Sequence, residues 1–493
     1  MTLGAGWLSR AGRAVCHTFL ERAAELVGIE RADVAVPGRQ TNGGHIVKQV
    51  LFVSYLFPPV IAGGIHRVAQ FSKYLPTFDW LPTVLTVSDD PRHPVDDELL
   101  RELPAEIEIV RAYCPLLRAG TPNQPHRQGG IAGSLRTLKR QLSRLAFIPE
   151  WQVVWYPWAV QAGRRLLRRR KFDAVLATYG PATNLLVGAR LAREARLPLV
   201  VDFRDVWADN PLPVWPTPFH RRAALRMERR IVRQAAQVIA VSVPMTRHLA
   251  ELHDLPTEKM TTITNGFDPQ DLPRARDRRF DIVPAADEAP RPFRLCFTGS
   301  VYGSVFLQAL FAAVAELGRN GRITPATFRL QFVGNMTIDE PRQAGVAEYV
   351  DVHPPVPHKQ VFEYLGQADV LLLVEMIGYH ARFSYASKLF DYLLAGKPIV
   401  ALCEESEMTA HVVRQLGGCV VHPGDVAGIS GTIEKLLAAR AVRSSPVDIE
   451  REPWRSFDRL RLTERLAKVL DAATMQKAPE NRPPVAPLVK SAG

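Results

Sequence analysis

Residues 384–398 read SYASKLFDYLLAGKP and predict a short amphipathic helix that leads into a strand. Ser387 is placed to cap the start of this helix, because a serine hydroxyl there can accept a backbone N–H bond. Gly396 and Pro398 are typical of a helix end, and the apolar residues 399–402 have the character of a buried strand. A helix that alternates with strands in this way indicates an α/β fold.

The start of the same helix has residues suited to binding a nucleotide. The positive N-terminal end of a helix attracts phosphate, and Lys388 adds a cation there. Asp391 lies about one turn into the helix, where its carboxylate can accept two hydroxyls of a ribose. The simpler interpretation is an ordinary capped helix with a solvated lysine and aspartate.

Short apolar runs alternate with helix-like segments on both sides of a break at residues 274–292. The runs before the break are VLFVSYLF, TVLTV, DAVLATY, PLVVDFRD and QVIAVS, and those after it are RLCFTGS, FRLQFVG, EYVDVHP, ADVLLLVE, KPIVALC and GCVVHP. This is the βαβ rhythm of a parallel, doubly wound sheet, and it occurs twice. The sequence therefore predicts two Rossmann-like domains.

The break itself, RARDRRFDIVPAADEAPRP, is dense in proline, alanine and charge and is typical of a linker. We accordingly predict an N-terminal extension at 1–45, a first domain at 46–273, a linker at 274–292, a second domain at 293–445, a C-terminal helical segment at 446–475 and a disordered tail at 476–493.

The composition is that of a globular protein. The chain has 493 residues, 47% of them apolar and 23% charged, with a formal net charge of +12. This length suggests two or three domains with cores of their own. Cys16, Cys114, Cys296, Cys403 and Cys419 form no CxxC pair and no zinc-ligand spacing, so we expect a reducing compartment and no metal site.

Charged residues interrupt every apolar run near the N-terminus, beginning with Arg10 and Arg13. These runs are well short of a signal-peptide core or of the roughly 20 residues that cross a bilayer. The longest apolar run elsewhere, residues 370–374, has the length of a buried strand. We therefore expect a cytoplasmic protein.

Two loops that follow predicted strands contain further candidate residues. Gly63 and Gly64 come just before a helix that begins near His66 and Arg67, and paired glycines there let backbone N–H groups approach an anion. A tight turn that simply needs glycine is the alternative.

The second loop, DFRDVWADN at residues 202–210, places Arg204 and Asp205 at the carboxyl end of a strand. These residues can bind sugar hydroxyls or supply a base or an electrostatic stabiliser. A buried arginine–aspartate pair that fixes the loop is the alternative.

Together these segments resemble the family-4 glycosyltransferases, in particular the bacterial polysaccharide type. The resemblance runs from about Lys48 to Asp471 and rests on VLFVSYLFPPVIAGGIHRV, DFRDVWADNP, ITNGFD and SKLFDYLLAGKPIV. It implies a GT-B fold, in which two Rossmann-like domains face each other across a cleft and the last helix crosses back to the first. Such enzymes transfer a sugar from a nucleotide diphosphate sugar, with retention and without a metal.

The resemblance also assigns roles. It implies that Asp391, where glutamate is more usual, binds the donor ribose, that Gly63 and Gly64 line the cleft, and that Thr298-Gly299-Ser300 faces the diphosphate. The sequence departs from the family in three places: Phe383 stands where the first residue of an acidic pair is usual, no basic pair follows Ser300, and DFRD replaces a loop that often carries a catalytic histidine.

From the motifs, the resemblance and these departures we predict the following site. The catalytic candidates are Arg204 and Asp205; the donor-binding candidates are Gly299, Ser300, Arg382, Ser384, Ser387, Lys388 and Asp391; and those of the glycine loop and acceptor are Gly63, Gly64, His66 and Arg67.

Basic residues are clustered in three stretches, around residues 131–145, 164–171 and 222–233. The first joins Arg136, Arg140 and Arg144 to an apolar stripe and can lie on an anionic membrane, which would suit a lipid-linked acceptor. A core-packed helix with a solvated basic face is the alternative. Nucleic-acid binding is not expected, because no recognition motif accompanies the arginines.

The sequence thus predicts a glycosyltransferase of the hexosyltransferase type, which uses a nucleotide diphosphate sugar as co-substrate and has no bound cofactor. Its acceptor would be a glycan or a lipid-linked sugar in polysaccharide or glycolipid assembly, in the cytoplasm or on the inner face of the membrane. One alternative is a nucleotide-sugar epimerase of the same fold, which needs no acceptor. Another is a non-catalytic nucleotide-sugar-binding subunit, suggested by Phe383 and the altered histidine loop.

Overall fold

A computed structural model describes residues 41–42, 45–88, 93, 95–117, 145, 147–210, 215–273, 291–299, 307–375, 381–439 and 453–475. Most of the predicted N-terminal extension and linker, the basic stretch 131–145 except Leu145, and the tail 476–493 lie outside these residues. No described helix is long and apolar enough to cross a membrane.

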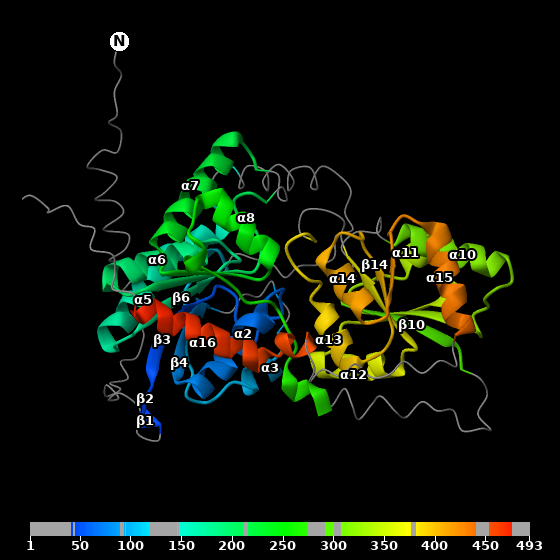
Figure 1. Ribbon diagram of the computed structural model, residues 1–493, viewed down its shortest axis with the longest axis horizontal. Helices are drawn as coiled ribbons and strands as arrows, with labels where there is room; N and C mark the ends of the chain where they lie inside the picture. Colours follow the sequence, from blue (N-terminus) through cyan, green and yellow to red (C-terminus); the bar gives the residue numbers. More distant parts are fainter. Residues whose placement is uncertain are drawn as a thin grey trace, which may run out of the picture. The chain divides into compact units, whose positions relative to one another are not determined.

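The first sheet has seven parallel strands in the order β5-β4-β3-β6-β7-β8-β9 (Figure 1). The strands are β3 Lys48–Val53, β4 Trp80–Val87, β5 Glu108–Ala112, β6 Ala174–Thr178, β7 Leu199–Phe203, β8 Gln237–Ala240 and β9 Met260–Thr262. The helices of this part of the chain are α2 Ile65–Tyr74, α3 Glu98–Arg101, α5 Tyr156–Arg169, α6 Thr183–Ala195, α7 Pro218–Gln234 and α8 Val243–His253.

The second sheet has six parallel strands in the order β12-β11-β10-β13-β14-β15. The strands are β10 Phe293–Thr298, β11 Phe328–Val333, β12 Val350–His353, β13 Val370–Val374, β14 Ile399–Leu402 and β15 Cys419–Val421. The helices are α10 Gln308–Arg319, α11 Asp339–Gln343, α12 His358–Gln367, α13 Lys388–Ala395, α14 Met408–Gln415 and α15 Val426–Ala438.

The remaining elements are short, apart from the last helix, α16 Arg459–Met475. They are the antiparallel pair β1 Thr41–Asn42 and β2 His45–Ile46, and the 3-10 turns η1 Leu75–Phe78, η2 Pro115–Leu117, η3 Trp151–Trp155, η4 Thr257–Lys259, η5 Pro269–Asp271, η7 Ala347–Tyr349 and η8 Trp454–Phe457.

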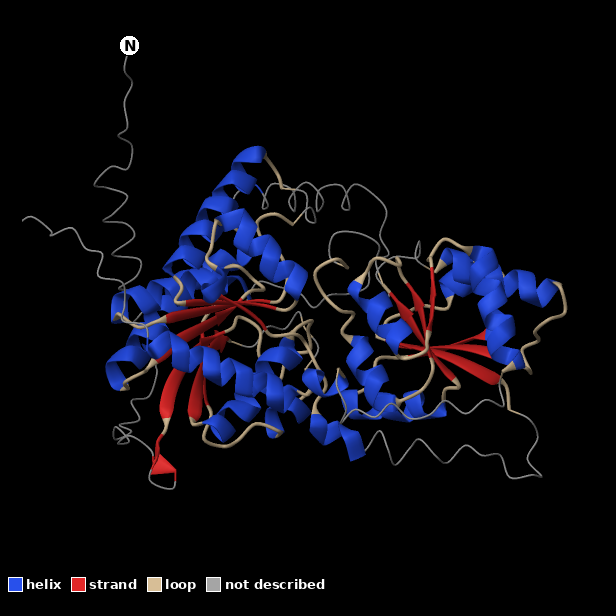
Figure 2. Cartoon of the chain, viewed as in Figure 1, coloured by secondary structure: helices blue, strands red, loops and turns tan. Residues whose placement is uncertain are grey.

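Both sheets have helices packed on them, as Figure 2 shows, and their central strands are buried. β13 is typical, because its sequence VLLLV is a continuous apolar run rather than an alternating one, as expected for a parallel strand covered on both faces. The α/β prediction with two Rossmann-like units is therefore confirmed.

Helix α16 belongs to the core of the first sheet although it follows the second in sequence. Its residues Leu462, Leu466 and Leu470 are fully buried in one cluster with Val50 and Phe52 of β3. Figure 1 shows α16 running beside α2, which it contacts. The chain thus returns to its first domain, as the resemblance implies.

Candidate functional site

Helix α13 forms as its sequence predicts. Leu389, Phe390 and Leu393 are buried, and the helix ends at Gly396, whose φ of +60° is the left-handed conformation that favours glycine. Ser387 does occupy the N-cap position, but its side chain makes no capping hydrogen bond. The expectation that Ser387 caps the helix is therefore wrong, because its backbone is already helical rather than extended.

Lys388 and Gly299 come together at the carboxyl ends of the strands of the second sheet. A Cβ atom at Gly299 would lie 2.4 Å from Cε of Lys388, and the φ of +106° at Gly299 also requires glycine. The ammonium of Lys388 lies 4.8 Å from the centre of the Phe297 ring. Burial lowers the pKa of Lys388, while the nearby carboxylates of Asp391 and Glu375 partly oppose this effect.

Asp391 is held by a histidine that the sequence analysis did not single out. Nε2 of His358, the first residue of α12, lies 3.2 Å from Oδ1 of Asp391. Desolvation alone would lower the pKa of His358, but the carboxylates of Asp391, Asp271 and Glu102 raise it to about 9. The sequence did contain one signal for His358, because Pro357 and His358 open a helix just after a strand.

The glycine-loop helix α2 reaches the same place through His66. The ring centres of His66 and His358 lie 4.9 Å apart. His66 is exposed as a residue, but desolvation of its ring against α12, and then the positive charge of His358, lower its pKa. His66, His358 and Asp391 therefore form a chain from α2 through α12 to α13.

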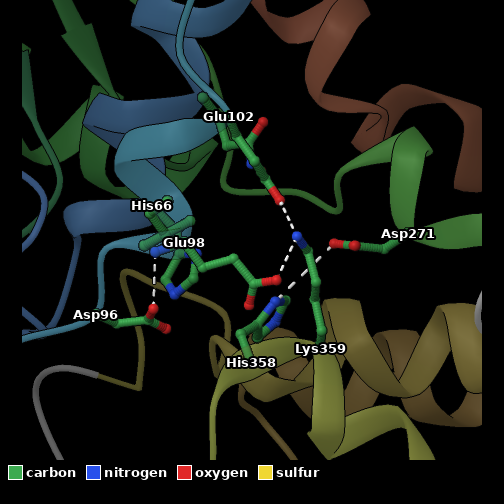
Figure 3. A pocket seen from close by; sticks show the side chains of 9 residues that line it. His66, Asp96, Glu98, Glu102, Asp271, His358 and Lys359 are labelled. Carbon is green, nitrogen blue, oxygen red and sulfur yellow. Dashed lines mark hydrogen bonds and ion pairs between the residues drawn. The ribbon is translucent and has the colours of Figure 1, made fainter.

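These histidines open onto a pocket with acidic walls, shown in Figure 3. Lys359 of α12 reaches between Glu98, at 2.5 Å, and Glu102, at 3.0 Å, both contributed by the first part of the chain. The residues that line the pocket are His66, Gln70, Asp96, Glu98, Leu99, Glu102, Asp271, His358 and Lys359. The pocket thus lies where α2 and α3 meet α12.

Arg204 lies against the glycine loop, so the structure brings together two of the predicted groups. Its Nη1 donates to the carbonyl oxygen of Gly63 at 2.6 Å, and its Nη2 donates to that of Gly180 at 3.0 Å. A Cβ atom at Gly64 would lie 1.3 Å from Nη1 of Arg204, and the φ of +80° at Gly64 is a conformation that favours glycine. Asp205 lies beside it, with Oδ2 4.0 Å from Nε of Arg204.

Arg67 is buried, and this corrects its predicted place among residues that contact an acceptor. Its guanidinium donates two hydrogen bonds to Asp202, at 3.0 and 2.6 Å. It donates three more to residues 263–265, between 2.9 and 3.2 Å in length. The expected arginine–aspartate pair that fixes the 202–210 loop therefore exists, but its arginine is Arg67 and not Arg204.

Phe383, which stands where the resemblance implies an acidic residue, makes packing contacts. Its ring lies 5.0 Å from that of His248 in α8, and it packs against the core of the first sheet. Its carbonyl oxygen accepts a hydrogen bond of 2.5 Å from Oγ of Ser242. The segment before α13 is thus fixed to the first sheet rather than directed at a ligand.

Three further residues at the second sheet were missed as site candidates. Glu375 directly follows β13, Cys403 directly follows β14, and Glu407 precedes α14. The pKa of Glu375 is raised to about 8 and that of Glu407 to about 7. In both cases burial is the larger cause and a neighbouring carboxylate adds to it. An acidic residue at the carboxyl end of an apolar strand was a usable signal for Glu375.

The other residues predicted to bind the donor add little to the description of the site. Arg382 and Ser387 are exposed, Ser384 is half-buried, and Ser300 lies outside the described residues. The site therefore rests on Gly63, Gly64, Arg204, Asp205, His66, Gly299, Lys388 and Asp391, together with the unpredicted His358.

Known proteins resemble the chain in part of its sequence and in its fold. Residues 63–266 match the family model described as glycosyl transferase 4-like domain. No curated protein sequence matches the chain. Three of the solved structures that it resembles are described next.

HepE from Anabaena, solved in complex with UDP, is 17% identical over 86% of this chain and 100% of its own, with a TM-score of 0.54. Sucrose-phosphate synthase from Thermosynechococcus elongatus is 15% identical over 87% and 97%, with a TM-score of 0.55. The UDP-GlcNAc 2-epimerase from Methanocaldococcus jannaschii is 10% identical over 86% and 99%, with a TM-score of 0.51. These likenesses show that the fold is GT-B, as predicted.

The pairing of His358 gives a pH-dependent prediction. Its pKa in the folded protein, about 9, exceeds the ordinary value of 6.5, so the protonated ring stabilises the fold. That contribution is fully present below pH 6.5 and is lost as the pH rises through about 9. Replacing His358→Gln should therefore cost about 1 to 3 kcal/mol of unfolding free energy at the lower pH and much less at the higher.

Urea denaturation of both proteins across this pH range measures the effect. His411→Gln, at an exposed histidine of α14, is the matched control and should change stability little at any pH. A cost of His358→Gln that does not vary with pH would contradict the assigned ion pair.

Proposed function

We propose that the protein is a glycosyltransferase that transfers a sugar from a nucleoside diphosphate sugar. The observation that carries this proposal is the convergence of Gly299, Lys388 and Asp391 at the carboxyl ends of the strands of the second sheet. Ligands of open α/β sheets bind at that edge. The glycosyl transferase 4-like match and the UDP named for HepE support the same substrate class.

Each of these groups has a part in holding the donor. The carboxylate of Asp391 would accept the ribose hydroxyls, for which it would give up its contact with His358. Lys388 and the N-terminal end of α13 would stabilise the charge on the diphosphate leaving group, and the backbone of Gly299 would approach it closely. In this proposal the diphosphate needs no metal.

The acceptor would bind on the side of the first sheet. Arg204, fixed against Gly63, presents a cation to the reacting groups, and Asp205 has an accessible carboxylate. We propose residues 46–273 as the acceptor domain and residues 293–445 as the donor domain. Retention at the anomeric carbon, a hexose donor and a role in polysaccharide or glycolipid assembly remain parts of the proposal that rest on the resemblance.

A second candidate function is a nucleotide-sugar epimerase, which the likeness to the M. jannaschii enzyme favours. An epimerase would convert the donor sugar without an acceptor, whereas a transferase would release the nucleoside diphosphate only when the sugar is transferred or hydrolysed. Chromatography of UDP-sugars incubated with the protein distinguishes the two. A nucleotide-binding subunit without catalysis would bind the UDP-sugar and leave it chemically unchanged.

The first prediction of this proposal concerns Asp391→Asn. An amide accepts hydrogen bonds from ribose less well than a carboxylate, so the affinity for UDP should fall by roughly 10- to 100-fold. Isothermal titration calorimetry of UDP with both proteins measures this. Asp339→Asn, which changes an exposed carboxylate of α11, is the control and should bind as wild type does. Equal affinity in wild type and Asp391→Asn would remove Asp391 from the donor site.

We also propose that the first domain lies on the anionic inner face of the membrane, where a lipid-linked acceptor would be found. Helix α7 supports this, because it exposes a row of arginines and a phenylalanine, Phe219, that is 61% accessible. The exposed arginines are Arg221, which pairs with Asp209, and Arg222, Arg226, Arg229, Arg230 and Arg233. The basic helix predicted around Arg136, Arg140 and Arg144 lies outside the described residues.

Replacing Arg222, Arg226 and Arg229 together by glutamine should strongly reduce binding to anionic vesicles, since each basic residue contributes about 1 kcal/mol near such a surface. Co-sedimentation with phosphatidylglycerol vesicles at low salt measures the loss. A control protein with Arg319, Arg322 and Arg342 replaced has the same net charge and should bind like wild type. Equal sedimentation of the two variants would contradict a membrane role for α7.

A further inference from the structure

Glu375, Cys403 and Glu407 converge in a cluster at the carboxyl ends of β13 and β14. One ligand atom from each residue, a carboxylate oxygen or the thiol sulfur, lies within 4.8 Å of the other two. Cys403 and Glu407 are buried, and Glu375 is half-buried. The chain therefore holds two carboxylates and a thiol close together and away from bulk water.

Glu407 shows that the cluster is not satisfied by the protein alone. Glu407 is only 2% exposed, and its carboxylate oxygens make no hydrogen bond of ordinary geometry; the one backbone group that acts on them is that of Glu404. Glu407 occupies the N-cap position of α14 with extended backbone, but it makes no capping hydrogen bond. Burying an unpaired carboxylate is costly, and this one points at the cluster instead of at its own helix.

The surroundings of Glu375 lead to the same conclusion. Its Oε2 is buried without a partner, while the hydroxyl of Thr409 forms a hydrogen bond with its carboxylate. Oγ1 of Thr409 in turn accepts a hydrogen bond of 3.1 Å from the backbone N–H of Ala386. Neither Glu375 nor Glu407 forms an ion pair with a described residue, although Lys388 is near enough to Glu375 to lower its pKa.

We propose that Glu375, Cys403 and Glu407 bind a divalent transition-metal ion of the zinc type. A thiolate favours zinc over magnesium or calcium, and carboxylate oxygens are also zinc ligands. Three protein ligands leave one position open, and Thr409 orients Glu375 as an outer-shell partner does.

The ion would link the segments that follow β13 and β14 to the start of α14. Its ligands are not the proposed diphosphate contacts Lys388 and Gly299, although Glu375 lies near Lys388, and the site does not depend on the proposed transferase activity. Sequence spacing gave no sign of it, because Glu375 and Cys403 follow two different strands of the sheet.

Titration of the metal-free full-length protein with Co²⁺ tests the proposal. Cobalt substitutes for zinc and gives a sulfur-to-cobalt charge-transfer absorption when a thiolate is a ligand. One equivalent should bind with this absorption and be displaced by Zn²⁺. Cys403→Ser should abolish the charge-transfer band, and Glu407→Gln should weaken binding by about tenfold or more, as loss of even an outer-shell partner does.

Two control variants should behave as wild type does in the titration. Cys419→Ser removes a thiol outside the cluster, and Glu405→Gln removes an exposed carboxylate of the same loop. Circular dichroism shows whether each variant is folded. If a variant of Cys403 or Glu407 does not fold, Glu375→Gln is titrated in its place.

Native mass spectrometry of the wild-type protein with Zn²⁺ provides a result that needs no variant, and one retained ion is expected. No retained ion, or a charge-transfer band that persists in Cys403→Ser, would overturn the proposal.

Discussion

The buried ion pair between Arg67 and Asp202 is the interaction on which the first half of the site depends. The two residues are 135 positions apart, and the same guanidinium also binds the backbone at residues 263–265. The pair thus fixes the helix after the glycine loop, the end of β7 and the turn that precedes the second domain. Arg204 lies two residues after Asp202 and is therefore held against Gly63. Removing one partner of such a pair commonly costs about 3 to 5 kcal/mol, because the other charge is left buried.

The second half of the site is connected to the first through histidines. His66 follows the glycine loop by two residues, and its ring contacts His358, which holds Asp391. A ligand that takes the carboxylate of Asp391 would therefore release His358 and alter a contact made by α2. In the proposed function, donor binding at Asp391 would thus be coupled to the contact between α2 and α12, which would suit an enzyme that closes around its substrate before the sugar moves.

Local signals in the sequence were sufficient for the elements and for much of the donor helix. The glycine and proline that end α13 and the apolar run of β14 were recognised because these effects act over a few residues. Side-chain partners could not be predicted in the same way. Asp391 meets His358 across 33 positions, and the burial of Arg67 depends on a strand that enters the sheet much later. The resemblance supplied the role proposed for Asp391, but it could not reveal that Phe383 packs on the first sheet or that Glu375 meets Glu407.

The central claim is that a nucleoside diphosphate binds at the start of α13 and at the end of β10. Hydrogen–deuterium exchange of the protein with and without UDP tests it directly, because bound ligand slows the opening of the backbone that it contacts. The account predicts slower exchange at residues 388–391 and at Gly299 when UDP is added. Unchanged exchange at both places, with or without protection elsewhere in the chain, would contradict it.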